Sequence, residues 1–329
     1  MDSLSEFDLI RKYFESLSAQ VSVVDSVGQS DSKTTVQLGI GDDCALIDPP
    51  DGMSLCISMD TMVEAVHFPL NAPAEKVGYR ALAAALSDLA AMGAKPSHFT
   101  LSLTMPEADQ CWLAAFSKGL QSLMQQFDLL LVGGDTTKGP LTIGIQVHGF
   151  LPKKTAMLRS KAKQGDIIGV TGTLGDAGAA LELFDKNELT PDERYLMDRY
   201  FHPSPRIKQG IELRSFAHAC IDISDGLLAD AAHIAEKSGV LLELDLECLP
   251  ISKALLSIQG GHAGHLAATA GDDYELLFTL SEEKWAELRR QDDAGIFTAI
   301  GRVKKGAGVV ALKNGRAVTQ ITQGYRHFE

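Results

Sequence analysis

Aspartate side chains recur in this sequence directly beside apolar runs, in positions that predict strand ends. Turn geometry alone explains any single one, because Asp is a common turn residue. In open α/β folds, however, ligand sites gather at the carboxyl ends of strands. Five such places together favour a metal site over five independent turns. The aspartates concerned are Asp42, Asp43, Asp60, Asp135, Asp222, Asp225, Asp272 and Asp273.

Asp88 differs from the others because it lies within an apolar helical segment, "ALAAALSDLAAM". A helix that is apolar nearly all round is buried, so the carboxylate of Asp88 needs a partner. A neutral hydrogen-bonded Asp, or an ion pair with Arg80 or Lys95, would suffice. A hard cation shared with the strand-end aspartates explains more of the pattern. Sites rich in oxygen and free of sulfur favour Mg²⁺, with calcium left open.

Neighbouring residues refine this metal hypothesis. Ser58 and Asp60 share one face of the strand predicted over 54–60, so both oxygens can reach one ion. Asp225 has a second interpretation as the N-cap of the helix that begins near Leu227.

Two glycine-rich segments could approach phosphate groups, although the sequence lacks the GxxxxGK[ST] motif of P-loop enzymes. "VGGDTTKGP" (132–140) places Asp135 where it could hold a metal between phosphates. "VTGTLGDAGAAL" (170–181) precedes a predicted helix, whose N-terminus could bind an anion. Tight packing of helix on strand explains the second segment equally well.

Composition excludes several classes of protein. The chain has 329 residues, is 45% hydrophobic and carries a formal net charge of -13. Nucleic acids and acidic membranes require a basic surface, so neither is an expected partner. The five scattered cysteines predict no disulfide framework or zinc site. With no signal-like N-terminus or membrane-length apolar run, we expect a cytoplasmic protein.

Strand-like and helix-like segments alternate along the chain and predict two α/β halves. We expect an N-terminal domain over residues 1–152 and a C-terminal domain over 153–329, with the junction in the basic stretch that follows Pro152. The main predicted strands are at 54–60, 98–106, 166–172, 240–247, 274–280 and 297–303, with two more around a Gly-rich turn within 128–152 and a strand followed by a turn at 219–226. The main predicted helices are at 73–96, 109–127, 174–184, 227–239 and 282–291.

Nine motifs resemble those of bacterial thiamine-monophosphate kinases, a family within the aminoimidazole-ribonucleotide (AIR) synthetase superfamily. They occur in order from end to end of the chain: "LGIGDDCAL", "DTMVEAVHF", "LSDLAAMGAKP", "GGDTTKGP", "TGTLGDAGAAL", "HPSPRI", "IDISDGLLAD", "GDDYELLF" and "GYRHF". The superfamily shares the third and fourth motifs in looser form. The full ordered set is much more specific to the family.

The resemblance implies ATP-dependent phosphorylation of thiamine monophosphate to thiamine diphosphate. It also implies an AIR-synthetase-like two-domain α/β fold, with the N-terminal halves of a homodimer forming a shared β-barrel. Several Mg²⁺ ions are implied, with Asp43, Ser58, Asp60, Asp88, Asp135, Asp222 and Asp225 as ligands. ATP contacts are implied for Gly134, Asp135, Arg159 and Ser224, and substrate contacts for His67, Asp272 and Tyr325.

Two positions depart from the family pattern. Met59 stands where the family usually has Thr, so we expect its side chain in the core and any metal contact from its backbone. Asp272 stands where Glu is usual, and its side chain is one methylene shorter. On spacing alone, His67 is a hydrogen-bonded structural histidine, whereas the resemblance makes it a substrate contact.

The resemblance leads to a mechanism and to its rivals. A phosphate-monoester acceptor is already ionised near neutral pH, so we expect direct in-line transfer, assisted by Mg²⁺ in an aspartate cage, without a phosphoenzyme. One alternative is an ATP-dependent purine-biosynthesis ligase of the same superfamily. Another is a non-catalytic protein that binds divalent cations or nucleotides.

Overall fold

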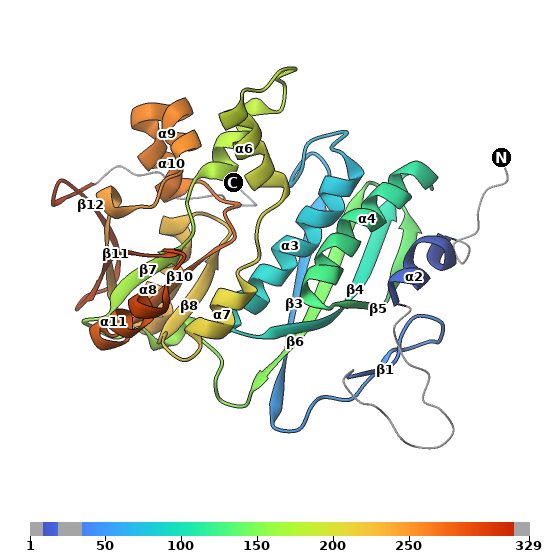
Figure 1. Ribbon diagram of the computed structural model, residues 1–329, viewed down its shortest axis with the longest axis horizontal. Coiled ribbons are helices and arrows are strands. Elements are labelled where there is room, and N and C mark those ends of the chain that lie inside the picture. The colour runs from blue at the N-terminus through green and yellow to red at the C-terminus, as the bar shows by residue number, and fades with distance from the viewer. Residues whose placement is uncertain (1–8, 19–34, 319–329) are drawn as a thin grey trace. The chain divides into compact units, whose positions relative to one another are not determined.

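The computed structural model describes residues 9–18 and 35–318, without the side chain of residue 16, and divides the chain into two units. Unit 1 comprises Met1–Leu89 and Ala94–Lys154. Unit 2 comprises Ala90–Gly93 and Thr155–Glu329. Each unit combines a sheet with helices (Figure 1), so the α/β architecture predicted from the sequence is confirmed.

The main sheet of unit 1 has four long strands in the order β3-β6-β4-β5. β4 and β5 run parallel, whereas β3–β6 and β6–β4 are antiparallel. A two-stranded sheet lies apart from it. The strands are β1 (Val36–Leu38), β2 (Leu46–Ile47), β3 (Met53–Val63), β4 (Lys95–Met105), β5 (Leu130–Lys138) and β6 (Thr142–Pro152).

Two long helices of unit 1, α3 (Ala74–Met92) and α4 (Gln110–Phe127), cross at close range. Glycines permit the approach: a Cβ on Gly78 would lie 2.3 Å from the carbonyl oxygen of Phe116. Asp109 caps the start of α4 by accepting hydrogen bonds from the backbone N–H groups of Cys111 and Trp112. The shorter elements are the π-helix η1 (Ile10–Phe14) and α2 (Glu15–Ser18).

Unit 2 contains a seven-stranded mixed sheet in the order β13-β12-β9-β11-β7-β10-β8. β9 and β12 run parallel, and the other neighbouring pairs are antiparallel. Residues of β7, β8 and β10 are buried along the whole length of each strand. The strands are β7 (Ile167–Thr171), β8 (Ala219–Ile223), β9 (Leu241–Asp245), β10 (Glu275–Leu280), β11 (Phe297–Lys304), β12 (Gly308–Lys313) and β13 (Arg316–Ala317).

Seven α-helices and four short 3₁₀ turns are described in unit 2. The helices are α5 (Asp176–Ala180), α6 (Pro191–Phe201), α7 (Ile207–Leu213), α8 (Leu227–Ser238), α9 (Lys253–Gln259), α10 (Ala263–Thr269) and α11 (Glu282–Gln291). The 3₁₀ turns are η2 (Arg159–Lys161), η3 (Leu181–Leu183), η4 (Leu246–Cys248) and η5 (Gly260–His262). A hydrophobic core that includes Ile221, Ile234 and Leu242 joins β8, α8 and β9.

Three of the aspartates expected at strand ends lie inside strands. Asp60 is in the middle of β3, which continues to Val63, and Asp135 lies within β5. Asp222 is the fourth residue of β8. The expectation was wrong because side chains project from the faces of a strand along its whole length, so an Asp can reach outward without ending the strand.

The expectation that Met59 lies in the core is also wrong, since 56% of its surface is exposed. The predicted alternation along β3 holds, because Leu55, Ile57 and Met59 share one face and are all exposed. α3 packs on the opposite face, where Ser58 bonds to Asp88 of that helix. The apolar face of β3 is therefore the uncovered one within unit 1.

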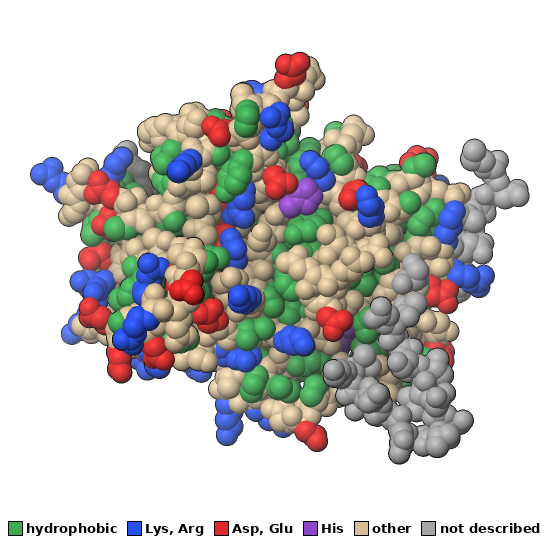
Figure 2. All heavy atoms as spheres, in the orientation of Figure 1, with side chains coloured by type: hydrophobic (Ala, Val, Ile, Leu, Met, Phe, Trp, Pro, Cys, Tyr) green, Lys and Arg blue, Asp and Glu red, His purple; other side chains and the backbone are tan. Residues whose placement is uncertain are grey.

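The charged side chains on the face of the molecule drawn in Figure 2 form no large patch of a single sign. In Figure 2, Lys and Arg side chains are intermixed with Asp and Glu side chains. Within residues 9–18 and 35–318, no helix combines the length and the apolar character that a membrane span requires.

Candidate active site

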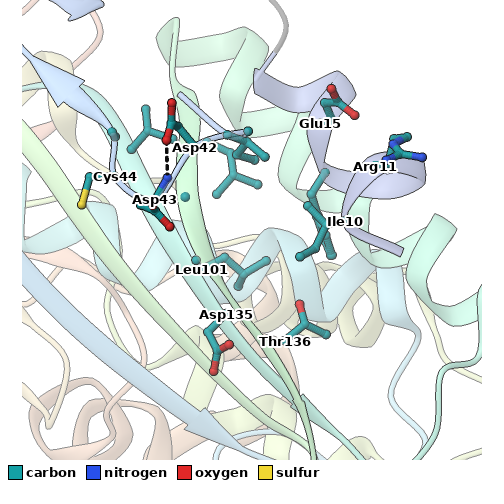
Figure 3. A pocket seen from close by; sticks show the side chains of 17 residues that line it. Ile10, Arg11, Glu15, Asp42, Asp43, Cys44, Leu101, Asp135 and Thr136 are labelled. Carbon is teal, nitrogen blue, oxygen red and sulfur yellow. Dashed lines mark hydrogen bonds between the residues drawn. The ribbon is translucent and has the colours of Figure 1, made fainter. Parts of the chain in front are cut away.

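A cavity of about 640 Å³ in unit 1 contains three of the residues that the sequence assigned to metal or nucleotide. Asp43, Gly134 and Asp135 all line it, although more than 90 positions separate Asp43 from Asp135. Figure 3 shows Asp43 and Asp135 at the cavity, with Leu101 between them. The two motifs "GIGDD" and "GGDTT" therefore converge on one site.

The backbone explains how these motifs approach each other. A Cβ on Gly134 would lie 1.9 Å from the carbonyl oxygen of Leu101, so only glycine fits where β5 runs against β4. Gly41 has a φ of 129°, a conformation that favours glycine. Beyond it, the backbone N–H of Asp43 donates to the carboxylate of Asp42 at 2.9 Å. The Asp pair forms a turn and lines the cavity at the same time.

The walls of the cavity combine apolar side chains with acidic ones, and Arg11 also lines it. Such a combination suits a ligand with a flat apolar ring and a phosphate tail whose charge a cation offsets. Sequence reasoning missed the contribution of η1, because it used the amphipathic N-terminal segment only to exclude a signal peptide. The apolar lining consists of Ile10, Phe14, Ile40, Ala45, Leu101, Leu131 and Val132.

A second acidic group in unit 1 joins β3 to α3. The hydroxyl of Ser58 donates to the carboxylate of Asp88. Residues 81–91 of α3 are all buried apart from Asp88, so this is the one carboxylate of a buried stretch. Burial, followed by the charge of Asp88, raises the pKa of Asp60 to about 6. Ser58, Asp60 and Asp88 therefore lie near one another, and the hydroxyl of Ser58 is the observed partner of Asp88.

Unit 2 holds a third acidic group around the turn after β8. Asp230 of α8 accepts hydrogen bonds from the backbone N–H groups of Ser224 and Asp225, both at 3.1 Å. Burial, then the charges of Asp222 and Asp225, raises the pKa of Asp230 to about 8. Sequence reasoning missed Asp230, whose signal was its place among the apolar residues of the first two turns of α8.

The interpretation of Asp225 as a helix N-cap is wrong. Gly226 occupies the cap position of α8, and no side chain there accepts a hydrogen bond from the first turn. The backbone amides just before the helix are instead bound by Asp230. The carboxylate of Asp225 therefore does not cap α8.

The remaining predicted residues are distributed as follows. His67 of unit 1 accepts a hydrogen bond at its Nδ1 from the backbone N–H of Val63, at 3.0 Å. Arg159 is exposed in η2 of unit 2. Asp272 donates from its backbone N–H to the carbonyl oxygen of Ser224 at 2.8 Å. Tyr325 lies outside the described residues.

The chemistry of these groups fits a hard divalent cation. Within the described ranges, no three His, Cys, Asp or Glu side chains gather closely enough to hold a metal ion by themselves. Asp60 is nevertheless half-buried and Asp230 is buried, and this burial, together with neighbouring carboxylates, raises the pKa of both. A bound cation would offset both the cost of burying these charged carboxylates and the repulsion from their neighbours. The hydroxyl and carboxylate oxygens present are ligands that Mg²⁺ prefers.

The second glycine-rich segment, around Gly172 and Gly175, binds the chain's own carboxylates. A Cβ on Gly172 would lie 2.2 Å from a carboxylate oxygen of Glu275. The backbone N–H of Gly175 donates to the carboxylate of Asp273 at 2.8 Å. Of the two interpretations of this segment, the structure supports close packing.

Comparisons with known proteins agree over nearly the whole chain. Family models described as "AIR synthase related protein", N-terminal and C-terminal domains, match residues 41–151 and 163–312. Thiamine-monophosphate kinase of Escherichia coli K12 is 42% identical over 330 residues, covering 98% of both chains. The Bacillus subtilis enzyme of that name is 35% identical over 310 residues, covering 90% of this chain and 95% of the relative.

Solved structures give the same result. Thiamine-monophosphate kinase from Stenotrophomonas maltophilia K279a matches with a TM-score of 0.82 and 42% identity, covering 87% of this chain and 93% of that chain. AaThiL, complexed with AMPPCP and TMP, matches with a TM-score of 0.78 and 32% identity, covering 99% and 97%. E. coli HypE, a hydrogenase maturation protein, shares the fold at a TM-score of 0.74 and 21% identity, covering 97% and 98%.

These matches confirm the predicted AIR-synthetase-like fold of two α/β parts. The two family models also cover the ordered motifs from the "GDD" segment to "GDDYELLF". This chain therefore belongs to the thiamine-monophosphate kinase family of phosphotransferases.

Proposed function

We propose that this protein transfers the γ-phosphoryl group of ATP to thiamine monophosphate, giving thiamine diphosphate and ADP. The observation that carries the proposal is the unit 1 cavity, which brings together Asp43, Gly134 and Asp135 beneath an apolar wall. Relatives named thiamine-monophosphate kinase, one of them solved with AMPPCP and TMP, support this choice of donor and acceptor.

The chain's own residues orient the ligands and offset charge in this proposal. A phosphate-monoester acceptor is ionised near neutral pH, so no side chain has to remove a proton from it. The apolar wall around Ile10 and Leu101 would hold the base of ATP, and the backbone at Gly134 would allow the phosphates to approach. We infer direct in-line transfer without a phosphoenzyme, because only positioning and charge neutralisation are needed.

Mg²⁺ is part of the proposal as the partner of the carboxylates. When bound, it neutralises the charge that accumulates between two phosphate-bearing ligands. The backbone of Met59 is a further candidate contact, consistent with a side chain that faces away from Asp60. The side chains proposed to hold the ions are Asp43, Ser58, Asp60, Asp88 and Asp135 in unit 1, and Asp222 and Asp225 in unit 2.

A panel of acceptors tests the function. Thiamine monophosphate, thiamine and aminoimidazole precursors are each offered with Mg-ATP, while ADP is followed by a coupled assay and thiamine diphosphate by chromatography. We expect both products with thiamine monophosphate alone, and neither after EDTA. ADP with an aminoimidazole acceptor would indicate a purine ligase, and nucleotide binding without ADP would indicate a non-catalytic protein. A phosphorylated enzyme that passes its phosphate on at a competent rate would contradict direct transfer.

We also propose that a second copy of this chain covers the apolar face of β3. Leu55, Ile57 and Met59 are 43%, 56% and 56% exposed on this face. β3 is also the edge strand of its sheet. Long edge strands with exposed apolar side chains invite pairing with another chain, and two identical faces can bury each other by symmetry. This proposal agrees with the homodimer implied by the sequence resemblance, and the cytoplasm remains the predicted location.

A further inference from the structure

The loop that follows α10 contains an unusual backbone conformation at residues without the freedom of glycine. Asp272 and Tyr274 have φ values of 69° and 51°, in the left-handed region that L-residues rarely adopt. Asp273 lies between them. Backbone in this region persists only where surrounding contacts hold it, and such residues gather at functional sites.

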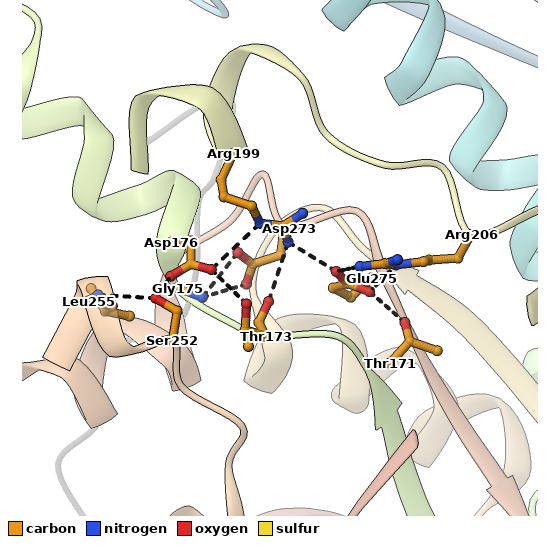
Figure 4. A network of polar contacts seen from close by, with 10 residues as sticks. All are labelled: Thr171, Thr173, Gly175, Asp176, Arg199, Arg206, Ser252, Leu255, Asp273 and Glu275. Carbon is orange, nitrogen blue, oxygen red and sulfur yellow. Dashed lines mark hydrogen bonds and ion pairs between the residues drawn. The ribbon is translucent and has the colours of Figure 1, made fainter. Parts of the chain in front are cut away.

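Asp273 supplies one of these holding contacts. Its side chain is buried, with 2% of the residue exposed, and both carboxylate oxygens accept from the backbone N–H of Gly175, at 3.0 and 2.8 Å. Gly175 is itself fixed, because a Cβ there would lie 2.6 Å from the backbone nitrogen of Ala267. The middle of the loop is thus bound to the turn before α5 (Figure 4).

Glu275 fixes the other end of the loop, where β10 begins. Its carboxylate accepts hydrogen bonds from Arg199 at 2.9 Å and from Arg206 at 2.6 and 2.5 Å. It also accepts from the hydroxyl of Thr171 at 2.6 Å. Two guanidinium groups and a hydroxyl on a fully buried carboxylate form a rigid anchor, because breaking it would leave buried charges unpaired.

These anchors determine where the carboxylate of Asp272 lies. The backbone N–H groups of Asp272 and Tyr274 donate to the carbonyl oxygens of Ser224 and Ile223, both at 2.8 Å. The phenol of Tyr274 then donates to Oδ1 of Asp272 at 3.2 Å. One continuous set of bonds therefore links the buried Asp273 to the orientation of Asp272 and to the turn that carries Ser224.

We infer that Asp273 and Tyr274 are positioning residues for acceptor selection, Asp273 by fixing the loop and Tyr274 by orienting the carboxylate of Asp272 toward a cationic heterocyclic phosphate. The inference rests on the proposed function and on Asp272 as an acceptor contact. A carboxylate held by a hydrogen bond presents its charge in one direction, which favours a ligand with a fixed positive ring over a neutral one.

A double-mutant cycle separates positioning from a merely structural role. The dissociation constant and KM for thiamine monophosphate, and the KM for ATP, are measured for Tyr274→Phe and Asp273→Ala, each with and without Asp272→Ala. Alanine is preferred to asparagine at position 273 because burial raises the pKa of Asp273 and asparagine would retain an acceptor. Asp166→Ala is the matched control, since Asp166 is similarly buried but bonds to His218 and to the backbone N–H of Lys163 instead of the loop or its anchors.

The expected result is non-additive. Tyr274→Phe should raise the KM for thiamine monophosphate about threefold to tenfold, as the loss of one hydrogen bond to a carboxylate predicts, with an unchanged melting temperature. Asp273→Ala should raise the same KM by about tenfold or more. Neither change should raise it further once Asp272 is alanine. Asp166→Ala should lower the melting temperature and leave the cycle with Asp272 additive.

Several outcomes would overturn the inference. If Tyr274→Phe and Asp273→Ala raise the KM for thiamine monophosphate by the same factor with and without the carboxylate of Asp272, both residues are merely structural. An unchanged dissociation constant in Asp272→Ala would remove the acceptor contact, while the proposed function would stand if the wild-type protein still forms thiamine diphosphate. Wild-type protein that binds thiamine monophosphate but does not phosphorylate it would reject the function and leave the cycle measurable by calorimetry. If Asp273→Ala does not fold, Tyr274→Phe decides the question.

Discussion

The hydroxyl of Ser58 in β3 donates a hydrogen bond to the carboxylate of Asp88 in α3. This contact connects β3, whose side chains alternate between an apolar and a polar face, with α3, whose residues 81–91 are all buried apart from Asp88. It also places the charge of Asp88 near enough to raise the pKa of Asp60. The polar face of β3 and the one carboxylate of the buried helical stretch thus form one acidic group.

Asp88→Asn should separate stability from metal binding. Removing the charge relieves repulsion with Asp60, so in metal-free buffer the melting temperature should stay constant or rise. The stabilisation by added Mg²⁺ should shrink, and kcat/KM should fall by about a hundredfold or more. Thermal unfolding at increasing Mg²⁺ gives the readout, with the exposed Asp48→Asn as control. The same Mg²⁺-dependent shift in both variants would exclude Asp88 from the site.

Gly134→Ala should damage unit 1 far more than Gly133→Ala. The added methyl group at position 134 would lie 1.9 Å from a backbone carbonyl oxygen, whereas at position 133 its nearest neighbour is the methyl of Thr100 at 3.9 Å. Displacing β4 or β5 costs about 1–3 kcal/mol by overpacking and would distort the cavity. Melting temperature and the KM for ATP are the measurements. Equal effects of the two variants would mean that the β4–β5 contact is not the constraint.

His98 should make the protein less stable in mild acid. The residue is 3% exposed, and its ring stacks on that of His148 with a centroid distance of 4.6 Å. Burial, followed by the charge of His148, lowers the pKa of His98 to about 4 from 6.5. Below pH 6.5 His98 binds a proton in the unfolded chain but stays neutral in the folded chain. Stability is therefore lost as the pH falls from about 6.5 to about 4. The loss approaches about 3 kcal/mol at most.

His98→Phe tests this prediction because it keeps an aromatic ring and removes the titration. The groups around this ring are His148, the hydroxyl of Ser97 at 3.2 Å and the ring of Phe150. Chemical denaturation of both proteins between pH 7.5 and pH 4 should show the variant gaining on the wild type as the pH falls. Parallel curves would assign the acid sensitivity to other groups.

Ile57→Asp should convert the proposed dimer to a single chain. The charge would be placed in the middle of the apolar face of β3, where its burial against a second copy is unfavourable. Sedimentation equilibrium would show the change of mass, and Leu256→Asp, at an exposed leucine of unit 2, is the control. If both variants sediment like the wild type, the face of β3 is not the interface.

Local patterns predicted the elements well but not what covers them. The alternation in "SLCISMD" placed Ser58 and Asp60 opposite Met59 correctly, yet which face meets α3 depends on packing far along the chain. Asp43 and Asp135 could be paired from their motifs. Ile10 and Phe14 could not, because an apolar side chain in an amphipathic helix looks the same whether it meets a core or a ligand cavity. Asp230 escaped notice because its bonds to the turn before its own helix need three-dimensional geometry.

The bond between Gly175 and Asp273 has a consequence for motion. To move residues 271–274 outward, the chain would have to expose a buried amide and a buried carboxylate together, and also release the two bonds to β8 and its turn. Such an opening is cooperative and therefore rare. The carboxylate of Asp272 is consequently in place before any ligand arrives, and little conformational entropy is lost there on binding.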